Sequence, residues 1–348
     1  MKKILFVGDA GSIHIAKYVN YFVHKEGYDV CVATFSKNNC TDCQNIMFLS
    51  DRNVTSGGGN YHYLLSVFKL AMLIRKYYPD YINAHFSYSM GFIALLAMKL
   101  SGINAKFSVV CHGSDIMAYP YKLCFLLNKI VLNAAERIIA VSEPMYKRLL
   151  AWNISSKKIF LGQYGVEIEK KELVKRDIDI ISIRDASPNS QIEFMLEALA
   201  QINGILQKKI VFVIPGIDHQ RLENLRNIYP HIIFHKKLNH SDILELLVRS
   251  KVYISATKSD GTALSLLEAM VYGAYPVVSD IATNICWIKD CINGRLFKNK
   301  YEFIENVSYA MNLPDMDFEK IRRINYALVD CKCNYSKQMK KIEEFLFK

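Results

Sequence analysis

Short apolar runs alternate with amphipathic stretches along almost the whole chain, and this alternation restricts the fold more than any other feature of the sequence. Continuous apolar runs separated by helical patterns are typical of parallel sheets that are covered by helices on both faces. Six such runs lie in the first half of the chain and five in the second: 4–7, 30–35, 81–85, 107–111, 138–141 and 159–161, then 178–183, 210–215, 231–235, 252–256 and 275–279. We therefore predict an α/β fold with two parallel sheets.

The segment 167–177 marks the boundary between the two halves, because it is charged and has no apolar period. A chain of 348 residues that is 51% hydrophobic can bury two cores. We expect an N-terminal Rossmann-like domain over 1–168 and a second one over 178–328, with a cleft between them. Residues 329–348 should contain a helix with one apolar side, formed by Met339, Ile342, Phe345 and Leu346.

The start of the sequence and its cysteines predict the compartment. The first apolar run ends at Asp9, too soon for the hydrophobic core of a signal peptide, and no apolar segment approaches the roughly 18 residues that span a bilayer. Cys40 and Cys43 form a CxxC, and Cys331 and Cys333 form a CxC almost 290 positions away, which favours reduced structural thiols over a zinc site. We expect a cytoplasmic protein without a bound metal.

The net charge of +11 and the isoelectric point near 9.0 indicate an anionic partner. We expect no nucleic acid, since the sequence has no recognition motif and no long basic run. The stretch 61–78 combines aromatic and aliphatic residues with Lys69, Arg75 and Lys76, as a helix at an anionic membrane surface does. The alternative is a core-facing helix with a basic outer side. We predict a peripheral contact with the inner face of the cell membrane.

Residues 259–270 carry two carboxylates on either side of a glycine turn that opens into an apolar helix. The strand-like run before the turn places it at the carboxyl end of a strand, where open α/β sheets bind their ligands. Gly261 lets the backbone approach a ligand. The free N–H groups at the start of the helix form an anion site that suits a diphosphate: Thr262, Ala263 and Leu264. Asp260 would then accept from a transferred sugar and Glu268 from a ribose; the alternative is an ordinary capped helix with a solvated Glu268.

This segment resembles the E-x7-E motif of the retaining glycosyltransferases of family 4, with Asp260 in the first acidic position and Glu268 in the second. Further landmarks of that family follow its order along nearly the whole chain: His112-Gly113-Ser114-Asp115, Val141-Ser142-Glu143, Tyr164-Gly165-Val166-Glu167, Ser279-Asp280-Ile281 and Asn293-Gly294. The resemblance implies the GT-B fold, in which two Rossmann-like domains face each other across a cleft. It also implies an acceptor-binding first domain, a donor-binding second domain and a C-terminal helix, here within 329–348, that packs back on the first domain.

The resemblance assigns roles to individual residues. His112 would contact the donor sugar through its ring or its backbone carbonyl, and the alternative is a core histidine bonded to Asp115. Arg184 takes the position of an arginine that stabilises the departing diphosphate. Asn189 stands where the family has a lysine, five residues later. Lys258 would replace the missing charge, with Lys236 and Lys237 as alternatives.

The remaining predicted contacts lie in three loops. Gly216 resembles the glycine of the turn under the nucleotide, and Lys237 lies where the family's backbone meets the nucleobase. The cleft edge on the acceptor side would be formed by Gly11, Ser12 and His14. Their turn is not G-x-G-x-x-G, and the strand-like run 30–35 ends without an acidic residue, so a nicotinamide cofactor is not expected.

The sequence therefore predicts a hexosyltransferase that moves a sugar from a nucleoside diphosphate sugar to a hydroxyl of a glycan or lipid-linked saccharide, with retention of configuration. Its product would belong to a polysaccharide, a lipopolysaccharide or another cell-surface glycoconjugate. Asp260, His112 and Arg184 are the predicted catalytic residues. No cofactor or metal is expected, because helix dipoles and basic side chains compensate the phosphate charge. The alternatives are a nucleotide-sugar 2-epimerase of the same fold and a catalytically inactive scaffold of a glycan-assembly complex.

Overall fold

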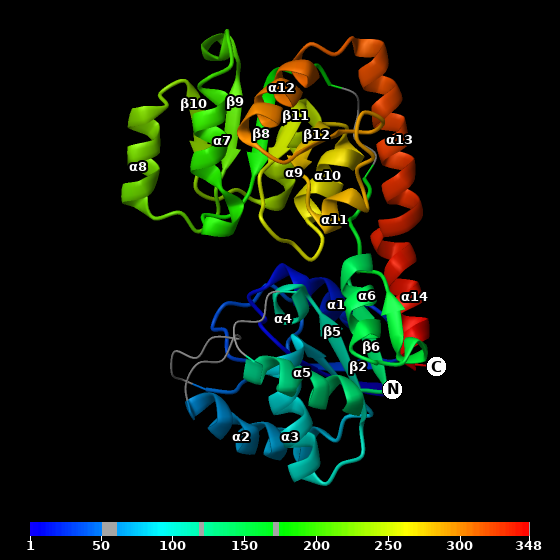
Figure 1. Ribbon diagram of the computed structural model, residues 1–348. Coiled ribbons are helices and arrows are strands. Elements are labelled where there is room, and N and C mark those ends of the chain that lie inside the picture. Colours follow the sequence, from blue (N-terminus) through cyan, green and yellow to red (C-terminus); the bar gives the residue numbers. More distant parts are fainter. Residues whose placement is uncertain (51–60, 118–121, 170–173, 348) are drawn as a thin grey trace. The chain divides into compact units, whose positions relative to one another are not determined.

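The computed structural model describes residues 1–50, 61–117, 122–169 and 174–347. The chain forms two compact units, the first from Met1–Tyr164 with Ser336–Lys348 and the second from Gly165–Tyr335. Each unit is a parallel sheet with helices on both faces (Figure 1). The predicted α/β fold with two parallel sheets is therefore confirmed.

The first unit contains a seven-stranded parallel sheet in the order β3-β2-β1-β4-β5-β6-β7. Its strands are β1 Lys2–Val7, β2 Tyr28–Thr34, β3 Ile46–Phe48, β4 Tyr81–His85, β5 Lys106–Cys111, β6 Arg137–Ala140 and β7 Ile159–Leu161. The central strands are buried along most of their length, which is why they read as continuous apolar runs. Its helices are α1 Ile13–Val23, α2 Tyr61–Tyr77, α3 Phe92–Ser101, α4 Ser114–Met117, α5 Lys122–Ala134 and α6 Glu143–Ala151.

The second unit contains a six-stranded parallel sheet in the order β10-β9-β8-β11-β12-β13. Its strands are β8 Ile178–Ile183, β9 Ile210–Val213, β10 Ile232–His235, β11 Ser250–Ser255, β12 Tyr275–Ser279 and β13 Arg295–Phe297. Its helices are α7 Ile192–Leu199, α8 His219–Ile228, α9 His240–Arg249, α10 Leu264–Tyr272, α11 Ala282–Ile285, α12 Lys300–Met311 and α13 Asp315–Cys333. Neighbouring residues such as Ile180 and Ile181 enter two different cores, because side chains alternate between the faces of a strand.

The last helix, α14 (Tyr335–Phe347), packs on the first unit. Glu343 on α14 accepts hydrogen bonds from the hydroxyls of Tyr21 at 2.8 Å and Tyr28 at 2.6 Å. The ring of Phe347 packs edge-on against Tyr81 of β4, with centroids 4.4 Å apart. The apolar side of α14 is buried, as the spacing of Met339, Ile342 and Leu346 predicts.

The two strands that the sequence pattern missed are both short strands at sheet edges. β3 and β13 have three residues each, too few to show a period, and each pairs with a single neighbour. None of the helices in the described ranges combines the length and the hydropathy that crossing a bilayer requires.

Candidate functional site

The second sheet has its topological switch point between β8 and β11. The chain leaves β8 towards β9 on one side of the sheet and leaves β11 towards β12 on the other, which opens a crevice at the carboxyl ends of these two strands. Arg184 directly follows β8, and Asp260 lies in the loop after β11. The topology alone therefore brings together two residues that are 76 positions apart.

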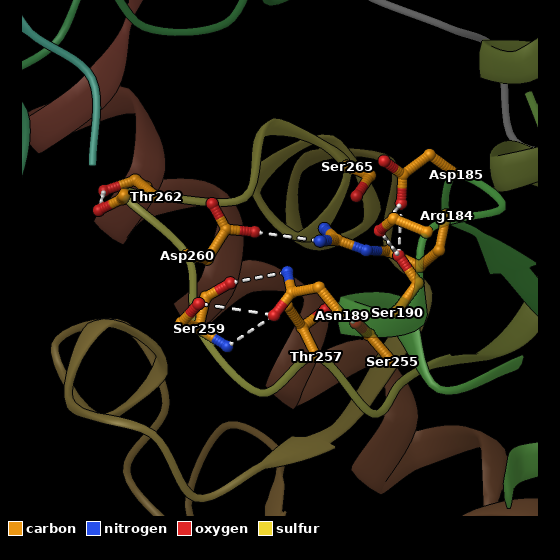
Figure 2. A network of polar contacts seen from close by, with 12 residues as sticks. Arg184, Asp185, Asn189, Ser190, Ser255, Thr257, Ser259, Asp260, Thr262 and Ser265 are labelled. Atoms are coloured by element: carbon orange, nitrogen blue, oxygen red, sulfur yellow. Dashed lines mark hydrogen bonds and ion pairs between the residues drawn. The ribbon is translucent and has the colours of Figure 1, made fainter. Parts of the chain in front are cut away.

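Arg184 and Asp260 form an ion pair, with Nη2 donating to Oδ2 at 3.0 Å (Figure 2). Their side chains are only 13% and 20% exposed. Burial alone would lower the pKa of Arg184, but the facing Tyr253 and Asp260 outweigh it and raise the pKa, so the guanidinium stays charged. Its Nε is buried and has no hydrogen-bond partner among the described residues. A guanidinium has five N–H donors, and Asp260 takes only one of them, which makes Arg184 a candidate anion ligand.

Asn189 fastens the loop after β8 to the loop that carries Asp260. Its Nδ2 donates to the carbonyl of Ser259 at 2.9 Å, and its Oδ1 accepts from the N–H of Ser259 at 3.1 Å (Figure 2). Its backbone carbonyl accepts from the N–H of Lys258 at 3.0 Å. Asn189, which stands in place of the family's lysine, thus links two loops. The side chain of Lys258 is exposed.

α10 begins one to two residues later than the sequence motif suggests. Its first residue is Leu264 and its N-cap is Ala263, so Thr262 precedes the helix. Alanine has no side chain that could accept from the N–H groups of the first turn. Ala263 therefore supplies no side-chain cap to the helix start, which suits an anion site.

Glu268 lies in α10 with its side chain 15% exposed. Its carboxylate pairs with Nε2 of His240, the first residue of α9, at 2.7 Å. The alternative of a merely solvated Glu268 is therefore wrong. Nothing in the spacing of the sequence points to His240, which lies 28 positions before its partner.

Two other predicted donor-side residues lie on loops at the same end of the sheet. Gly216 follows β9 and has a φ of +80°, a left-handed conformation that favours glycine. Lys237 follows β10 and is exposed.

The first sheet also has a switch point, between β1 and β4, and three histidines gather there. His14 lies in the first turn of α1, His85 is the last residue of β4 and His112 directly follows β5. The ring of His112 lies 5.6 Å from that of His14 and 5.0 Å from that of His85. His14 also bonds the Tyr164 hydroxyl through Nδ1 at 2.9 Å. Sequence reasoning missed His85, although its position at a strand's carboxyl end matches that of His112.

Asp115 holds the loop after β5 through the backbone. Its buried carboxylate accepts from the N–H groups of Ser87 at 3.0 Å, His112 at 3.1 Å and Gly113 at 3.0 Å. Burial raises the pKa of Asp115, and these three donors act in the opposite direction. The expected alternative, a core histidine bonded to Asp115, holds for the backbone N–H of His112 but not for its ring, which bonds His85 instead.

Gly11 and Ser12 shape the turn that leads into α1. Ser12 is the N-cap of α1, and its Oγ accepts from the N–H of His14 at 3.3 Å. A Cβ at Gly11 would lie 2.7 Å from Oγ of Ser36, so only glycine fits there without a shift. Within the described ranges, no three His, Cys, Asp or Glu side chains gather in an arrangement that could hold a metal ion.

Family models match consecutive parts of the chain. Residues 3–142 match the glycosyl transferase 4-like family, and residues 165–327 match the glycosyl transferases group 1. The two models together span most of the chain, which therefore belongs to these glycosyltransferase families. The uncharacterised glycosyltransferase MJ1069 of Methanocaldococcus jannaschii is 25% identical to it over 235 residues, which are 61% of this chain and 60% of that protein. TuaC of Bacillus subtilis, a candidate teichuronic acid biosynthesis glycosyltransferase, is 23% identical over 221 residues, 60% of this chain and 54% of its own length. The matches thus span little more than half of each curated relative.

Solved structures establish the fold of this glycosyltransferase. Sucrose-phosphate synthase from Thermosynechococcus elongatus superimposes with a TM-score of 0.82 at 15% identity, over 100% of this chain and 99% of that one. Anabaena HepE in complex with UDP and glucose superimposes with a TM-score of 0.78 at 13% identity, over 99% of each chain. The glycosyltransferase therefore has the GT-B fold that the sequence motifs imply. Each of its two sheets places a polar cluster at its switch point.

Proposed function

We propose that this glycosyltransferase transfers a hexosyl group from a nucleoside diphosphate sugar to a hydroxyl of a glycan or a lipid-linked saccharide, with retention and without a metal. The observation that carries the proposal is Arg184, a charged guanidinium that is 13% exposed and pairs with Asp260 at a sheet's switch point. Structural neighbours support the class of substrates, since HepE was solved with UDP-glucose, and TarM of S. aureus with UDP and α-GlcNAc-glycerol. WaaB, a lipopolysaccharide outer core galactosyltransferase, has the same fold.

Arg184 and the start of α10 supply the stabilisation that the reaction needs. Negative charge builds up on the leaving diphosphate as its bond to the sugar breaks. A fixed cation and the N–H groups at a helix start stabilise that charge without reorganising. Asp260 orients the Arg184 guanidinium through their ion pair. We propose that Arg184 contacts the phosphates and that Asp260 accepts from the sugar hydroxyls.

Glu268 completes the proposed donor site of the second unit, and His112 is the proposed sugar ligand of the first unit. Glu268 accepts from the ribose, with its carboxylate oriented by His240. His112 contacts the transferred sugar through its ring. With no nucleophile assigned beside the anomeric carbon, we propose a front-side displacement that retains the configuration. Gly11, Ser12 and His14 border the acceptor.

A screen of nucleoside diphosphate sugars by thermal shift, in the presence of EDTA, tests the donor class. A ligand that binds only the folded protein raises its melting temperature. We expect at least one uridine or guanosine diphosphate sugar to stabilise the wild-type protein, and Arg184→Ala to lose most of that shift. Sugar interconversion without an acceptor would identify a 2-epimerase instead, and binding without turnover would identify a scaffold.

We expect Asn189→Lys to raise the donor KM several-fold, because the lysine cannot replace the hydrogen bonds to Ser259 that hold the Asp260 loop. Each such bond is worth about 1 kcal/mol. Asn189→Ala is the matched comparison, since it removes the same bonds without adding charge, and both variants should behave alike in steady-state kinetics. A lysine variant with a lower donor KM than wild type would show that position 189 faces the phosphates.

The outer side of α2 supports a peripheral membrane contact. Leu64, Leu65, Phe68 and Met72 are 52% to 63% exposed, so the outer side of this core-facing helix is apolar as well as basic. A hollow of about 180 Å³ lies beside it, lined by Met47, Phe48, Leu49, Lys69, Met72, Leu73 and Lys76. Apolar side chains flanked by lysines suit the surface of an anionic bilayer.

Arg75 does not share that task. It donates through Nε to the carbonyl of Ser101 at 2.9 Å and through Nη2 to that of Leu100 at 3.0 Å, at the end of α3. We therefore assign the membrane contact to Lys69 and Lys76 and not to Arg75.

Replacing Lys69 and Lys76 together by Gln should weaken binding to phosphatidylglycerol vesicles roughly 10- to 30-fold, since each lysine near the surface contributes about 1 kcal/mol. Flotation or sedimentation of the protein with the vesicles measures the fraction bound. Added salt should weaken the binding of the wild-type protein. Lys289→Gln with Lys320→Gln changes the net charge equally on exposed residues of the second unit. An equal loss in this control, or equal binding to neutral vesicles, would contradict the proposed surface.

A further inference from the structure

His112, the proposed sugar ligand, is bonded to a second histidine, His85, that has no role in the proposed function. Nδ1 of His85 lies 2.9 Å from Nε2 of His112, and the two rings stack with centroids 5.0 Å apart and 24° between their planes. Phe86 packs on His112 as well, with centroids 4.7 Å apart. His85 itself is 1% exposed and is out of reach of a ligand. Because one ring nitrogen of His85 is bonded to His112, His85 can affect a ligand only through His112.

A single proton can lie between Nδ1 of His85 and Nε2 of His112, and two neutral rings can place it in two ways. In the first, Nδ1–H of His85 donates to a bare Nε2 of His112. In the second, Nε2–H of His112 donates to a bare Nδ1 of His85, which puts the proton of His85 on its other nitrogen, Nε2.

The surroundings of His85 decide between these arrangements. Its Nε2 is buried and has no hydrogen-bond partner among the residues that the structure describes. An orphaned buried N–H donor is rarer than an orphaned acceptor. The first arrangement is therefore favoured, because it leaves Nε2 of His85 without a proton. His112 then carries its proton on Nδ1.

Both histidine rings are neutral near neutral pH, where the two proton arrangements compete. Burial lowers the pKa of His85 to about 3, and the neighbouring His14 acts in the same direction. Burial also lowers the pKa of His112 well below its ordinary value, with His85 and His14 adding to the effect. The nearby carboxylate of Asp115 is occupied by backbone donors from Ser87, His112 and Gly113. The tautomer, and not the charge, thus defines what His112 offers.

We propose that His85 is a positioning residue that fixes the tautomer of His112, so that His112 presents Nδ1–H as a hydrogen-bond donor to its ligand. The inference rests on the proposed function for the identity of that ligand, an acceptor oxygen of the donor sugar. Nε2 of His112 is taken by His85, so Nδ1 is the one ring nitrogen left for a ligand. A hydroxyl that must itself donate would find no acceptor there.

Nuclear magnetic resonance of the protein labelled with ¹⁵N-histidine tests the tautomer without any substrate. Protonated and bare ring nitrogens have well-separated ¹⁵N shifts. We expect protons on Nδ1 of His112 and Nδ1 of His85, with bare Nε2 nitrogens in both rings at neutral pH. A proton on Nε2 of His112 would overturn the inference. The expected tautomers in a protein that transfers no sugar would support it and would count against the proposed function alone.

Two variants extend the test to catalysis. His85→Phe keeps a ring beside His112 but removes the donor, whereas His85→Gln keeps an N–H donor. We expect kcat/KM to fall about ten-fold in His85→Phe, as for one lost hydrogen bond, and to recover in part in His85→Gln. Tyr18→Phe, which alters the edge-on neighbour of His85, should keep the wild-type rate. Equal losses in both His85 variants, with equal falls in melting temperature, would reduce His85 to a packing residue and overturn the assignment.

Discussion

Arg184→Ala is expected to lower kcat about 10- to 150-fold, the largest effect that we predict for a single substitution. The contact between Arg184 and the diphosphate strengthens as the leaving group gains charge, so its loss raises the barrier. A charge-assisted hydrogen bond of this kind is worth about 1.5 to 3 kcal/mol. Steady-state kinetics with a saturating donor measures the effect on the chemical step.

Arg184→Lys is the matched comparison, because it keeps the charge but loses the planar arrangement of donors. We expect an intermediate rate. The removal of Arg184 leaves Asp260 without its partner, but Asp260 is 20% exposed and can be hydrated. The melting temperature should therefore change much less than the rate. A fully active Arg184→Ala beside an inactive Lys258→Ala would transfer the phosphate role to the lysine.

Glu268→Gln is expected to raise the donor KM about 10-fold or more while leaving kcat nearly unchanged. A ribose contact is present equally in the ground state and the transition state, so its loss weakens binding without raising the chemical barrier. The carboxylate bonds are charge-assisted and worth about 1.5 to 3 kcal/mol. Donor titrations of wild type and variant at a fixed acceptor concentration measure the change in KM and in kcat.

A donor that lacks a ribose hydroxyl sharpens this test. If Glu268 binds the ribose, a deoxyribose donor should bind less well than the normal donor in wild type, and the difference should shrink in Glu268→Gln, as in a double-mutant cycle. His240→Ala should show a smaller rise in KM, because His240 only orients the carboxylate. A large fall in kcat with an unchanged donor KM would rule out the ribose assignment.

The sequence pattern predicted the sheets well because parallel strands are buried on both faces and leave continuous apolar runs. It failed at β3 and β13, where three residues gain their strand conformation from one neighbouring strand. It also missed the π-helical turn Ser87–Gly91 after β4, whose preceding residue Phe86 has a φ of 72°. That turn depends on a distant group, since Asp115 accepts the N–H of Ser87.

The pairing of site residues was harder to predict than their positions. Arg184 and Asp260 were expected on one side of the site, but not their mutual ion pair, because local motifs do not report contacts between loops. The links from Asn189 to Ser259 and from His240 to Glu268 arise in the same way. His85 could have been found, since it ends a predicted strand next to the strand that leads to His112.

The most direct test of the central claim is the anomeric configuration of the product, followed by proton nuclear magnetic resonance with EDTA present. The donor selected by thermal shift is incubated with the protein and an octyl glycoside acceptor, and separately with water as the only acceptor. We predict release of the nucleoside diphosphate and a first-formed product with the anomeric configuration of the donor, at a rate that Arg184→Ala lowers. A product of inverted configuration, or no cleavage of any nucleoside diphosphate sugar, would contradict the account.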